Sequence, residues 1–354
     1  MTHTASRGSD PSALAGADVC AVVVSYHPDA DFPIRLRSVS PQVGTIVVVD
    51  NGSADAERNL LREAASDPKL DLIFNIENFG LARALNIGIQ RAAMLGYSWV
   101  LLLDQDSRVD RDMVRTLVDI QASIPDRERL AVVGSNYSDI TSRAPGITKG
   151  TPGVTTGTPG TIEQAALDGD WEEVEFVITS GSLVPLAAYF DLGPFREEFF
   201  IDYVDEDYCR RARAKGYRVV RSRKHLMSHA IGSPTQHEIF GVKKWTTNHS
   251  PDRRYYIARN NTVLLREYGN FRAGMWALKS LSRCLRQCKR IMLHEPMKTR
   301  KIAAVIQGWW DGIRGRMGPR RRRRGASTVD SDGMTFASDR KPPGEHPRGG
   351  VRWP

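Results

Sequence analysis

The chain has 354 residues, 41% of them hydrophobic, which suffices for one large α/β domain or two smaller ones. Residues 1–18 lack the apolar core of a secretory signal, and no apolar stretch approaches the roughly 20 residues that span a bilayer. The four cysteines do not have the Cys-x-x-Cys spacing of a zinc or redox site. We therefore expect a protein that stays in the cytosol with reduced thiols.

The net charge of +9 is unevenly distributed. Between Arg272 and Arg324 the chain carries sixteen Lys or Arg and only two acidic residues, so the remainder is slightly acidic. A basic segment joined to an acidic body is typical of a surface that docks on an anionic partner. Lipid headgroups and nucleic acid are the two candidates.

Apolar runs alternate with segments of helical periodicity over the first 110 residues. The pattern predicts strands at 19–25, 44–49, 70–75 and 99–103, and helices at 55–65 and 78–94. This alternation predicts a mostly parallel sheet with a ligand-binding crevice at its carboxyl edge. There is no P-loop and no Gly-x-Gly-x-x-Gly after the first strand, which disfavours a P-loop enzyme and a dinucleotide dehydrogenase.

The next part of the chain is less regular. A helix is predicted at 111–124 and strands at 130–134, 175–178 and 218–221. The Gly-, Pro- and Thr-rich stretch 141–160 predicts a loop that covers or shapes a site. The small residues 179–182 would let a ligand approach the backbone closely.

Two acidic clusters follow apolar runs. Asp104 and Asp106 end the strand at 99–103, where carboxylates can hold a hard cation, although a capped turn has the same composition. Asp202, Asp205 and Asp207 precede a helix, where they are either favourable charges at its start or include a general base.

Five motifs, in this order, resemble those of the inverting nucleotide-sugar glycosyltransferases of family two, which have the GT-A fold. They are Val-Ser-Tyr-His-Pro-Asp at 24–29, Val-Val-Asp-Asn-Gly-Ser at 48–53, Asn-x-Gly-x-Ala-x-Ala-Leu-Asn-x-Gly at 78–88, Leu-Leu-Asp-Gln-Asp-Ser at 102–107 and Phe-Ile-Asp-Tyr-Val-Asp at 200–205. Within that family the motifs look most like those of bacterial rhamnosyltransferases.

The resemblance implies a set of site residues. The nucleotide-sugar contacts it implies are Ser25, Tyr26, Asp50, Asn78, Gly80, Arg83 and Asp104. Asp106 and His229 would bind Mg²⁺ or Mn²⁺ on the diphosphate. The Glu-Asp base motif of the family is Val204-Asp205 here, so Asp205 is the expected base, with Asp202 and Asp207 as alternates.

The resemblance also implies the reaction. L-Rhamnose would pass from dTDP-L-rhamnose, with inversion, to a hydroxyl of a lipid-linked or growing cell-envelope polysaccharide. The alternative is a galactofuranosyl or other hexosyl transferase that uses a UDP-sugar, because a few hydroxyl contacts decide the choice of sugar. A nucleic-acid-binding protein that uses the Arg-rich end is a minor alternative.

The expected organisation has four parts: a disordered N-terminus at 1–18, a GT-A domain at 19–270, basic amphipathic helices at 271–316 and a disordered basic tail at 317–354. The apolar residues of the third part recur at helical spacing among lysines and arginines, as in helices that lie in a membrane interface. We therefore expect peripheral contact with the anionic inner face of the cell membrane.

Overall fold

The computed structural model describes residues 16–64, 67–139, 169–229, 235–239, 242–246, 248–269 and 274–320. For residues 137–139, 229, 235–239 and 242–246 it describes the backbone alone. The predicted flap at 141–160 and nearly all of the predicted N-terminal segment lie outside these residues.

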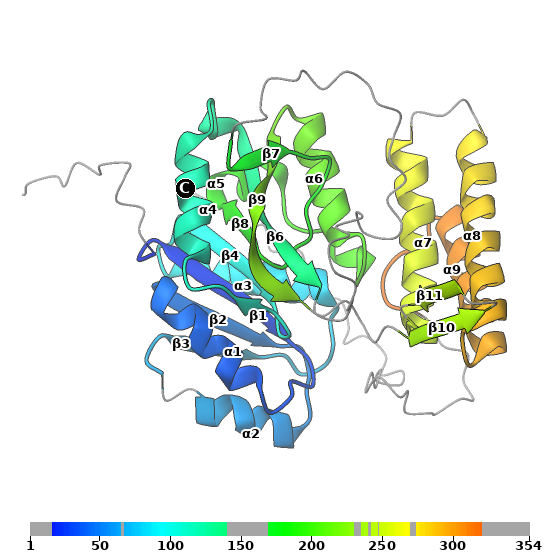
Figure 1. Cartoon of the computed structure of the whole chain (residues 1–354), viewed down its shortest axis with the longest axis horizontal. Helices are drawn as coiled ribbons and strands as arrows, with labels where there is room; N and C mark the ends of the chain where they lie inside the picture. Colours follow the sequence, from blue (N-terminus) through cyan, green and yellow to red (C-terminus); the bar gives the residue numbers. More distant parts are fainter. Residues whose placement is uncertain are drawn as a thin grey trace, which may run out of the picture.

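A nine-stranded sheet forms the centre of the described structure (Figure 1). Its strands are β1 (Val19–Ser25), β2 (Thr45–Asp50), β3 (Leu70–Phe74), β4 (Trp99–Asp104), β5 (Arg108–Val109), β6 (Leu130–Asp139), β7 (Trp171–Glu173), β8 (Ser182–Pro185) and β9 (Arg218–His229). The order is β3-β2-β1-β4-β8-β6-β9-β5, with β7 paired to β9. The first four strands are parallel and β8 is antiparallel to both of its neighbours. The expected α/β fold with a mostly parallel sheet is confirmed.

Helices cover both faces of this sheet. They are α1 (Phe32–Val39), α2 (Asp55–Ala64), α3 (Leu81–Met94), α4 (Met113–Ser123), α5 (Leu186–Leu192) and α6 (Val204–Ala214). Alternate residues of β1 show the arrangement: Val22 belongs to the buried cluster that includes residues of α3, α5 and α6, and Val23 to the cluster that includes residues of α1 and α4. Every residue of β1 is buried, as expected for a parallel strand covered on both faces.

The last part of the described chain is a bundle of three helices beside the sheet (Figure 1). It consists of α7 (Pro251–Tyr268), α8 (Met275–His294) and α9 (Lys298–Ile313), and a hairpin of β10 (Thr235–Ile239) and β11 (Val242–Thr246) precedes it. Gly308 of α9 allows close packing on α7, because an added Cβ would lie 2.2 Å from the carbonyl oxygen of Tyr255. A buried ion cluster connects the three helices: Glu295, directly after α8, forms ion pairs with Arg254 of α7 and Lys301 of α9.

Two expectations about elements were wrong. No strand forms at 175–178; the chain pairs instead through β8, whose Leu183 lies between Leu101 of β4 and Val133 of β6. Within the small-residue stretch 179–182, Gly181 packs closely on β6, since a Cβ there would lie 2.3 Å from Ser135 Oγ. The strand expected at 218–221 is longer than predicted: β9 continues to His229, which ends the strand.

The packed region also extends past residue 316. The Arg320 guanidinium donates to Gln307 and forms an ion pair with Asp252 at 2.7 Å. Residues 321–354 lie outside the described part. The cysteines are free thiols, as expected. Within the described part, no helix combines the length and the apolar content that a bilayer crossing requires.

Candidate active site

The motif residues meet at the carboxyl edge of the sheet because three parallel strands end there. In the register, Ser25 of β1 lies beside Asp50 of β2, and Val24 lies beside Asp104 of β4. This is the edge at which open α/β sheets bind ligands. The topology therefore brings residues from three separate motifs to one place.

The turn after β4 is held from two sides. Gln105 accepts from the Tyr26 backbone N–H at 2.7 Å and donates to the Tyr26 carbonyl at 3.1 Å. Arg35 Nε donates to the Gln105 carbonyl at 2.6 Å, and the Asp104 N–H donates to Ser180 Oγ at 3.1 Å. The carboxylates of Asp104 and Asp106 thus extend from a fixed turn, both half-buried.

The turn after β2 is stabilised by its own neighbours. Asp50 is almost fully buried; it accepts from the Ser53 hydroxyl and N–H, and from Arg58 Nε at 3.3 Å. Ser25 is also buried, whereas Tyr26 is half-buried at the same edge. Of the predicted nucleotide contacts Ser25, Tyr26 and Asp50, Tyr26 is the one whose side chain is partly exposed to a ligand in this conformation.

The Asn78 motif is joined to β2 through Asn51. Asn51 Nδ2 donates to Asn78 Oδ1 at 3.0 Å, and Asn78 Oδ1 also accepts from the Gly80 N–H at 2.9 Å. Gly80 has a φ of +88°, and a Cβ there would lie 2.7 Å from Phe200. Gly80 therefore lets the second acidic cluster approach the start of α3. Arg83 stays exposed, with its guanidinium 4.2 Å from the centre of the Phe79 ring.

The backbone before α6 is strained. Phe200, Asp202 and Tyr203 all have positive φ, at 67°, 62° and 64°, and none of them is glycine. Such conformations cost roughly 1–3 kcal/mol each and persist only where the surroundings enforce them. Because strain of this kind clusters at functional sites, the segment 200–203 is a candidate on backbone geometry alone.

One asparagine of α7 holds this strained segment. Asn260 Nδ2 donates to the carbonyls of Phe199, Ile201 and Asp202 at 2.8–3.0 Å. The preceding Arg259, also fully buried, donates to the Phe199 carbonyl at 2.9 Å. Sequence reasoning missed both roles. The available signal was an Arg-Asn pair inside a helix among buried apolar residues.

The three candidate bases have different surroundings. Asp207 is fully buried and forms ion pairs with Arg196 and Arg211, which makes it a structural residue. The Asp202 carboxylate is bound by Arg253 through three contacts of 3.1–3.2 Å. No cation pairs with Asp205 among the ion pairs of the described residues. Burial, with the nearby charges of Glu206 and Asp202, raises the pKa of Asp205 to about 7.

Arg253 also faces the first acidic cluster. Its pKa is raised, chiefly by the charge of Asp202 and further by Asp104 and Asp106, so one guanidinium lies within electrostatic reach of both clusters. Arg254, the next residue, binds the buried Glu295 of the helical bundle instead. Of these two neighbouring arginines, it is therefore Arg253 that lies at this edge.

The donors at this edge suit a hard divalent cation. Asp104 and Asp106 supply oxygen ligands from one turn, and Mg²⁺ is commonly bound by one or two carboxylates together with substrate phosphates. The register pairs Arg108 with Ser228, so the next residue, His229, lies opposite the end of the same turn. Within the described residues there is no group of three side chains arranged to hold a metal ion by itself. The residues present fit a cation that a diphosphate helps to bind.

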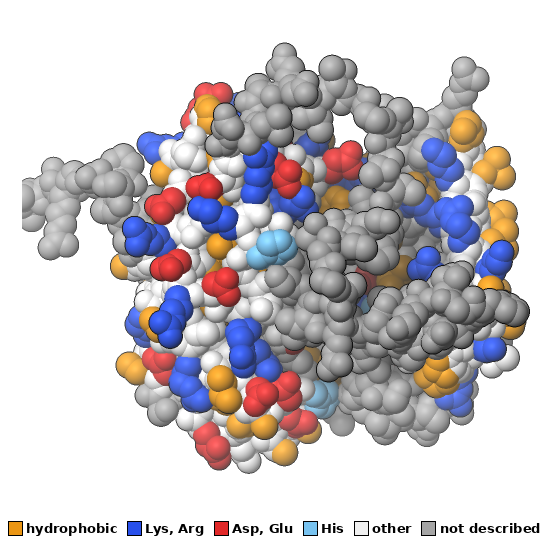
Figure 2. Space-filling view, in the orientation of Figure 1, with side chains coloured by type: hydrophobic (Ala, Val, Ile, Leu, Met, Phe, Trp, Pro, Cys, Tyr) orange, Lys and Arg blue, Asp and Glu red, His pale blue; other side chains and the backbone are white. Residues whose placement is uncertain are grey.

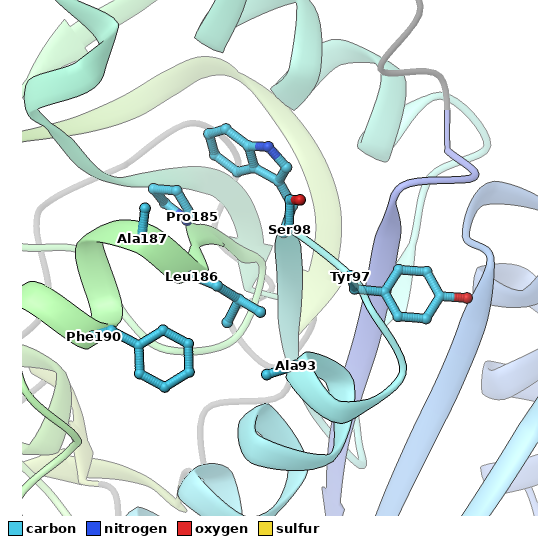
Figure 3. A pocket seen from close by; sticks show the side chains of 8 residues that line it. Ala93, Tyr97, Ser98, Pro185, Leu186, Ala187 and Phe190 are labelled. Atoms are coloured by element: carbon cyan, nitrogen blue, oxygen red, sulfur yellow. The ribbon is translucent and has the colours of Figure 1, made fainter. Parts of the chain in front are cut away.

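A separate hollow of about 380 Å³ lies at the opposite edge of the sheet (Figure 3). Its lining includes Tyr97 and Trp99 before and at the start of β4, and Pro185 and Phe190 from β8 and α5. These side chains are mostly apolar and carry no carboxylate. The acidic side chains of the two clusters therefore lie at the carboxyl edge, away from this hollow.

The family comparison agrees with this geometry. Residues 20–142 match the family described as Glycosyl transferase family 2. The chain thus contains a family 2 glycosyltransferase domain, and the protein is a glycosyltransferase with a GT-A-like fold.

Individual relatives narrow the comparison. The chain is 29% identical to the dTDP-rhamnosyl transferase RfbF of Shigella flexneri over 302 residues, which cover 84% of this chain and 96% of that protein. It is 26% identical over 211 residues to the low-salt glycan biosynthesis hexosyltransferase Agl10 of Haloferax volcanii, covering 57% of this chain and 64% of that protein. Among solved structures it resembles the mannosyltransferase PcManGT of Pyrobaculum calidifontis, in complex with GDP-Man and Mn²⁺. The TM-score is 0.51 at 15% identity, covering 86% of this chain and 88% of that chain, and it supports the fold.

Proposed function

We propose that this glycosyltransferase moves L-rhamnose from dTDP-L-rhamnose to a hydroxyl of a lipid-linked or growing cell-envelope polysaccharide. The observation that carries the proposal is the likeness to a dTDP-rhamnosyl transferase along 96% of that relative's length. The reaction would take place at the inner face of the cell membrane, where a lipid-linked acceptor is found.

The proposed step is a single displacement with inversion. The Asp205 carboxylate removes the proton of the acceptor hydroxyl, the acceptor oxygen bonds to the anomeric carbon, and the bond from that carbon to the dTDP oxygen breaks. Asp205 is the base because its pKa of about 7 lets it be ionised yet basic near neutral pH.

The other residues bind and orient the donor. Tyr26, Asn78 and Arg83 border the nucleotide side of the edge, and Asp104, Asp106 and His229 its diphosphate side. A Mg²⁺ or Mn²⁺ ion held by Asp106 and His229 would neutralise charge on the departing diphosphate. Arg253 adds a fixed positive charge close to the same carboxylates.

Transfer of another hexose from a UDP-sugar is the second candidate; similarity to Agl10, described as a hexosyltransferase, supports the hexose and leaves the nucleotide open. The pocket could distinguish galactofuranose or another hexose from rhamnose by a few hydroxyl contacts. A nucleic-acid role of the Arg-rich end has no counterpart among the relatives compared, which are described as transferases.

Calorimetric titration with dTDP and UDP, each with and without Mn²⁺, tests the proposal. We expect Mn²⁺-dependent binding of dTDP, and slow release of rhamnose from dTDP-L-rhamnose. Asp106→Ala should abolish the Mn²⁺ dependence, whereas Asp112→Ala, which removes an exposed carboxylate nearby, should not. Tighter binding of UDP would favour the second candidate, and binding of neither nucleotide would contradict the proposed site.

A further inference from the structure

The outer face of α8 carries exposed apolar side chains in a straight stripe. Leu278, Leu285 and Met292 are 68%, 60% and 53% exposed. They are seven residues apart, a spacing that keeps them on one side of a helix. Met275 and Leu293 add to the same side. Scattered exposed apolar residues are ordinary, but a stripe along a whole helix marks an interaction surface.

The stripe is bordered by positive charge and by no negative charge. Lys279, Arg286, Lys289 and Arg290 are exposed on the same helix, and α8 contains no Asp or Glu. Figure 2 shows hydrophobic and basic side chains interspersed along the edge of the molecule formed by α8. The combination is that of a helix that lies in a membrane interface, with apolar residues at the acyl boundary and cations among the headgroups.

The opposite face of α8 holds the helix in the bundle. Cys284 and Ile291 are buried in a cluster with Ala258 of α7 and Val305 of α9. Trp309 of α9 adds a hydrogen bond to Ser280 at 3.0 Å. The outer face is therefore presented by a fixed helix and does not have to fold on binding.

We infer that the outer face of α8 docks the protein on an anionic lipid bilayer. A second copy of the chain is a poor partner, because a symmetric contact would set these cations against their equivalents. The Arg-rich residues 320–324 have the wrong charge to cover the face. A nucleic acid matches the charge but leaves three large apolar side chains in water. This inference does not depend on the donor or base proposed above.

Vesicle flotation of the full-length protein tests the inference. We expect the protein to float with vesicles containing about one third phosphatidylglycerol, to do so less at high salt, and to stay in solution with phosphatidylcholine alone. Leu285→Asn should lower the partition coefficient ~10-fold. The matched control is Met94→Asn, which changes a residue 73% exposed at the end of α3 and should have no effect.

The charges are tested in the same way. The double change Lys289→Gln and Arg290→Gln should lower the partition coefficient roughly 25-fold, at about fivefold for each cation. The control is Arg115→Gln, which removes an 81% exposed cation from α4.

Three outcomes would overturn the inference: no flotation with anionic vesicles, flotation that the α8 variants leave unchanged, or α8-dependent binding to duplex DNA without flotation. dTDP binding measured on the same variants separates the two proposals. The affinity for dTDP should be unchanged in the α8 variants. If the unaltered protein bound no dTDP, that result would count against the proposed active site and not against docking through α8.

Discussion

Two acidic turns at the same edge of the sheet are built in different ways. The turn at Asp50 is stabilised locally: Ser53 and Arg58 bind the carboxylate, and Gly52 supplies the positive φ of 91°. The turn at 200–203 has no glycine, and its carbonyls are bound by Asn260, about 60 residues later in the chain.

The two turns also differ in what their acids can do. Asp50 is buried with its oxygens occupied, so it stabilises the turn that carries it. Beside the strained turn, Asp205 is held where its ionised form is unfavourable, and its pKa is raised to about 7. Relaxed geometry with a satisfied acid indicates a scaffold. Strain beside an acid of raised pKa is the combination on which we base the proposal that Asp205 is the base.

The largest expected effect comes from Asp205→Asn. The variant keeps the size of the side chain and removes the base, so the rate of sugar transfer should fall by ~10³-fold while dTDP affinity changes less than about twofold. Transfer kinetics and calorimetry measure the two quantities. Near-normal transfer would mean that the proton goes elsewhere, and Asp202→Asn would then be the variant to measure.

The pH profile of the unaltered protein gives a control that needs no mutation. A base must be ionised, so kcat/KM should fall about tenfold for each pH unit below about 7. An acid limb near pH 4 would contradict the assignment of Asp205.

The second prediction concerns the residue that holds the strained turn. Asn260→Ala removes three hydrogen bonds to backbone carbonyls, so the free energy of unfolding should fall by about 3 kcal/mol. The neighbouring Asn261 donates to the Tyr203 hydroxyl and accepts from Arg283, and neither bond involves a carbonyl of the turn. Asn261→Ala should therefore cost less, about 2 kcal/mol. If urea unfolding showed the same loss of unfolding free energy for both variants, Asn260 would have no special role in holding the turn.

The difference between the turns also explains what sequence reasoning could predict. Strands β1 to β4 ended within a residue or two of their predicted positions, because each is a short buried apolar run followed by a local turn signal. Asp50-Asn51-Gly52-Ser53 contains its own partners, so its position could be predicted from neighbouring residues. The position of Asp104 and Asp106 could be predicted in the same way, because they directly follow the apolar run of β4.

The rest of the site depends on contacts between distant residues. No local pattern indicates that Asn260 binds three carbonyls near residue 200, or that Arg253 and not Arg254 faces the carboxylates. Strand β8 was not predicted for the same reason. Its residues Ser182 and Leu183 lack a strong strand pattern, and they form a strand because they fill the space between β4 and β6.

The third prediction reverses the usual effect of a mutation. Between its ordinary pKa of 3.8 and its folded pKa of about 7, Asp205 binds a proton more tightly in the folded chain than in the unfolded one. Stability attributable to Asp205 is therefore lost as pH rises through about 7. Asp205→Asn should stabilise the protein by about 2 kcal/mol at pH 8 and by little at pH 4.

Thermal or urea unfolding of variant and parent at both pH values measures this difference. Asp50→Asn is the contrasting change, because it weakens contacts that the folded state makes, and it should destabilise the protein. If both variants destabilised the protein at pH 8, the two acids would not differ as proposed.

The smallest expected effect tests whether charge contributes to holding the strained turn. Arg253 and Asp202 form an ion pair, but Arg253 is 37% exposed, so solvent screens the attraction. A double-mutant cycle of Arg253→Gln and Asp202→Asn should give a coupling of about 1 kcal/mol or less in unfolding free energy. Arg83→Gln, which removes an exposed cation of the same edge, is the control and should show no coupling to Asp202. A coupling as large as the Asn260→Ala effect would mean that this ion pair, and not the carbonyl contacts, enforces the positive φ values before α6.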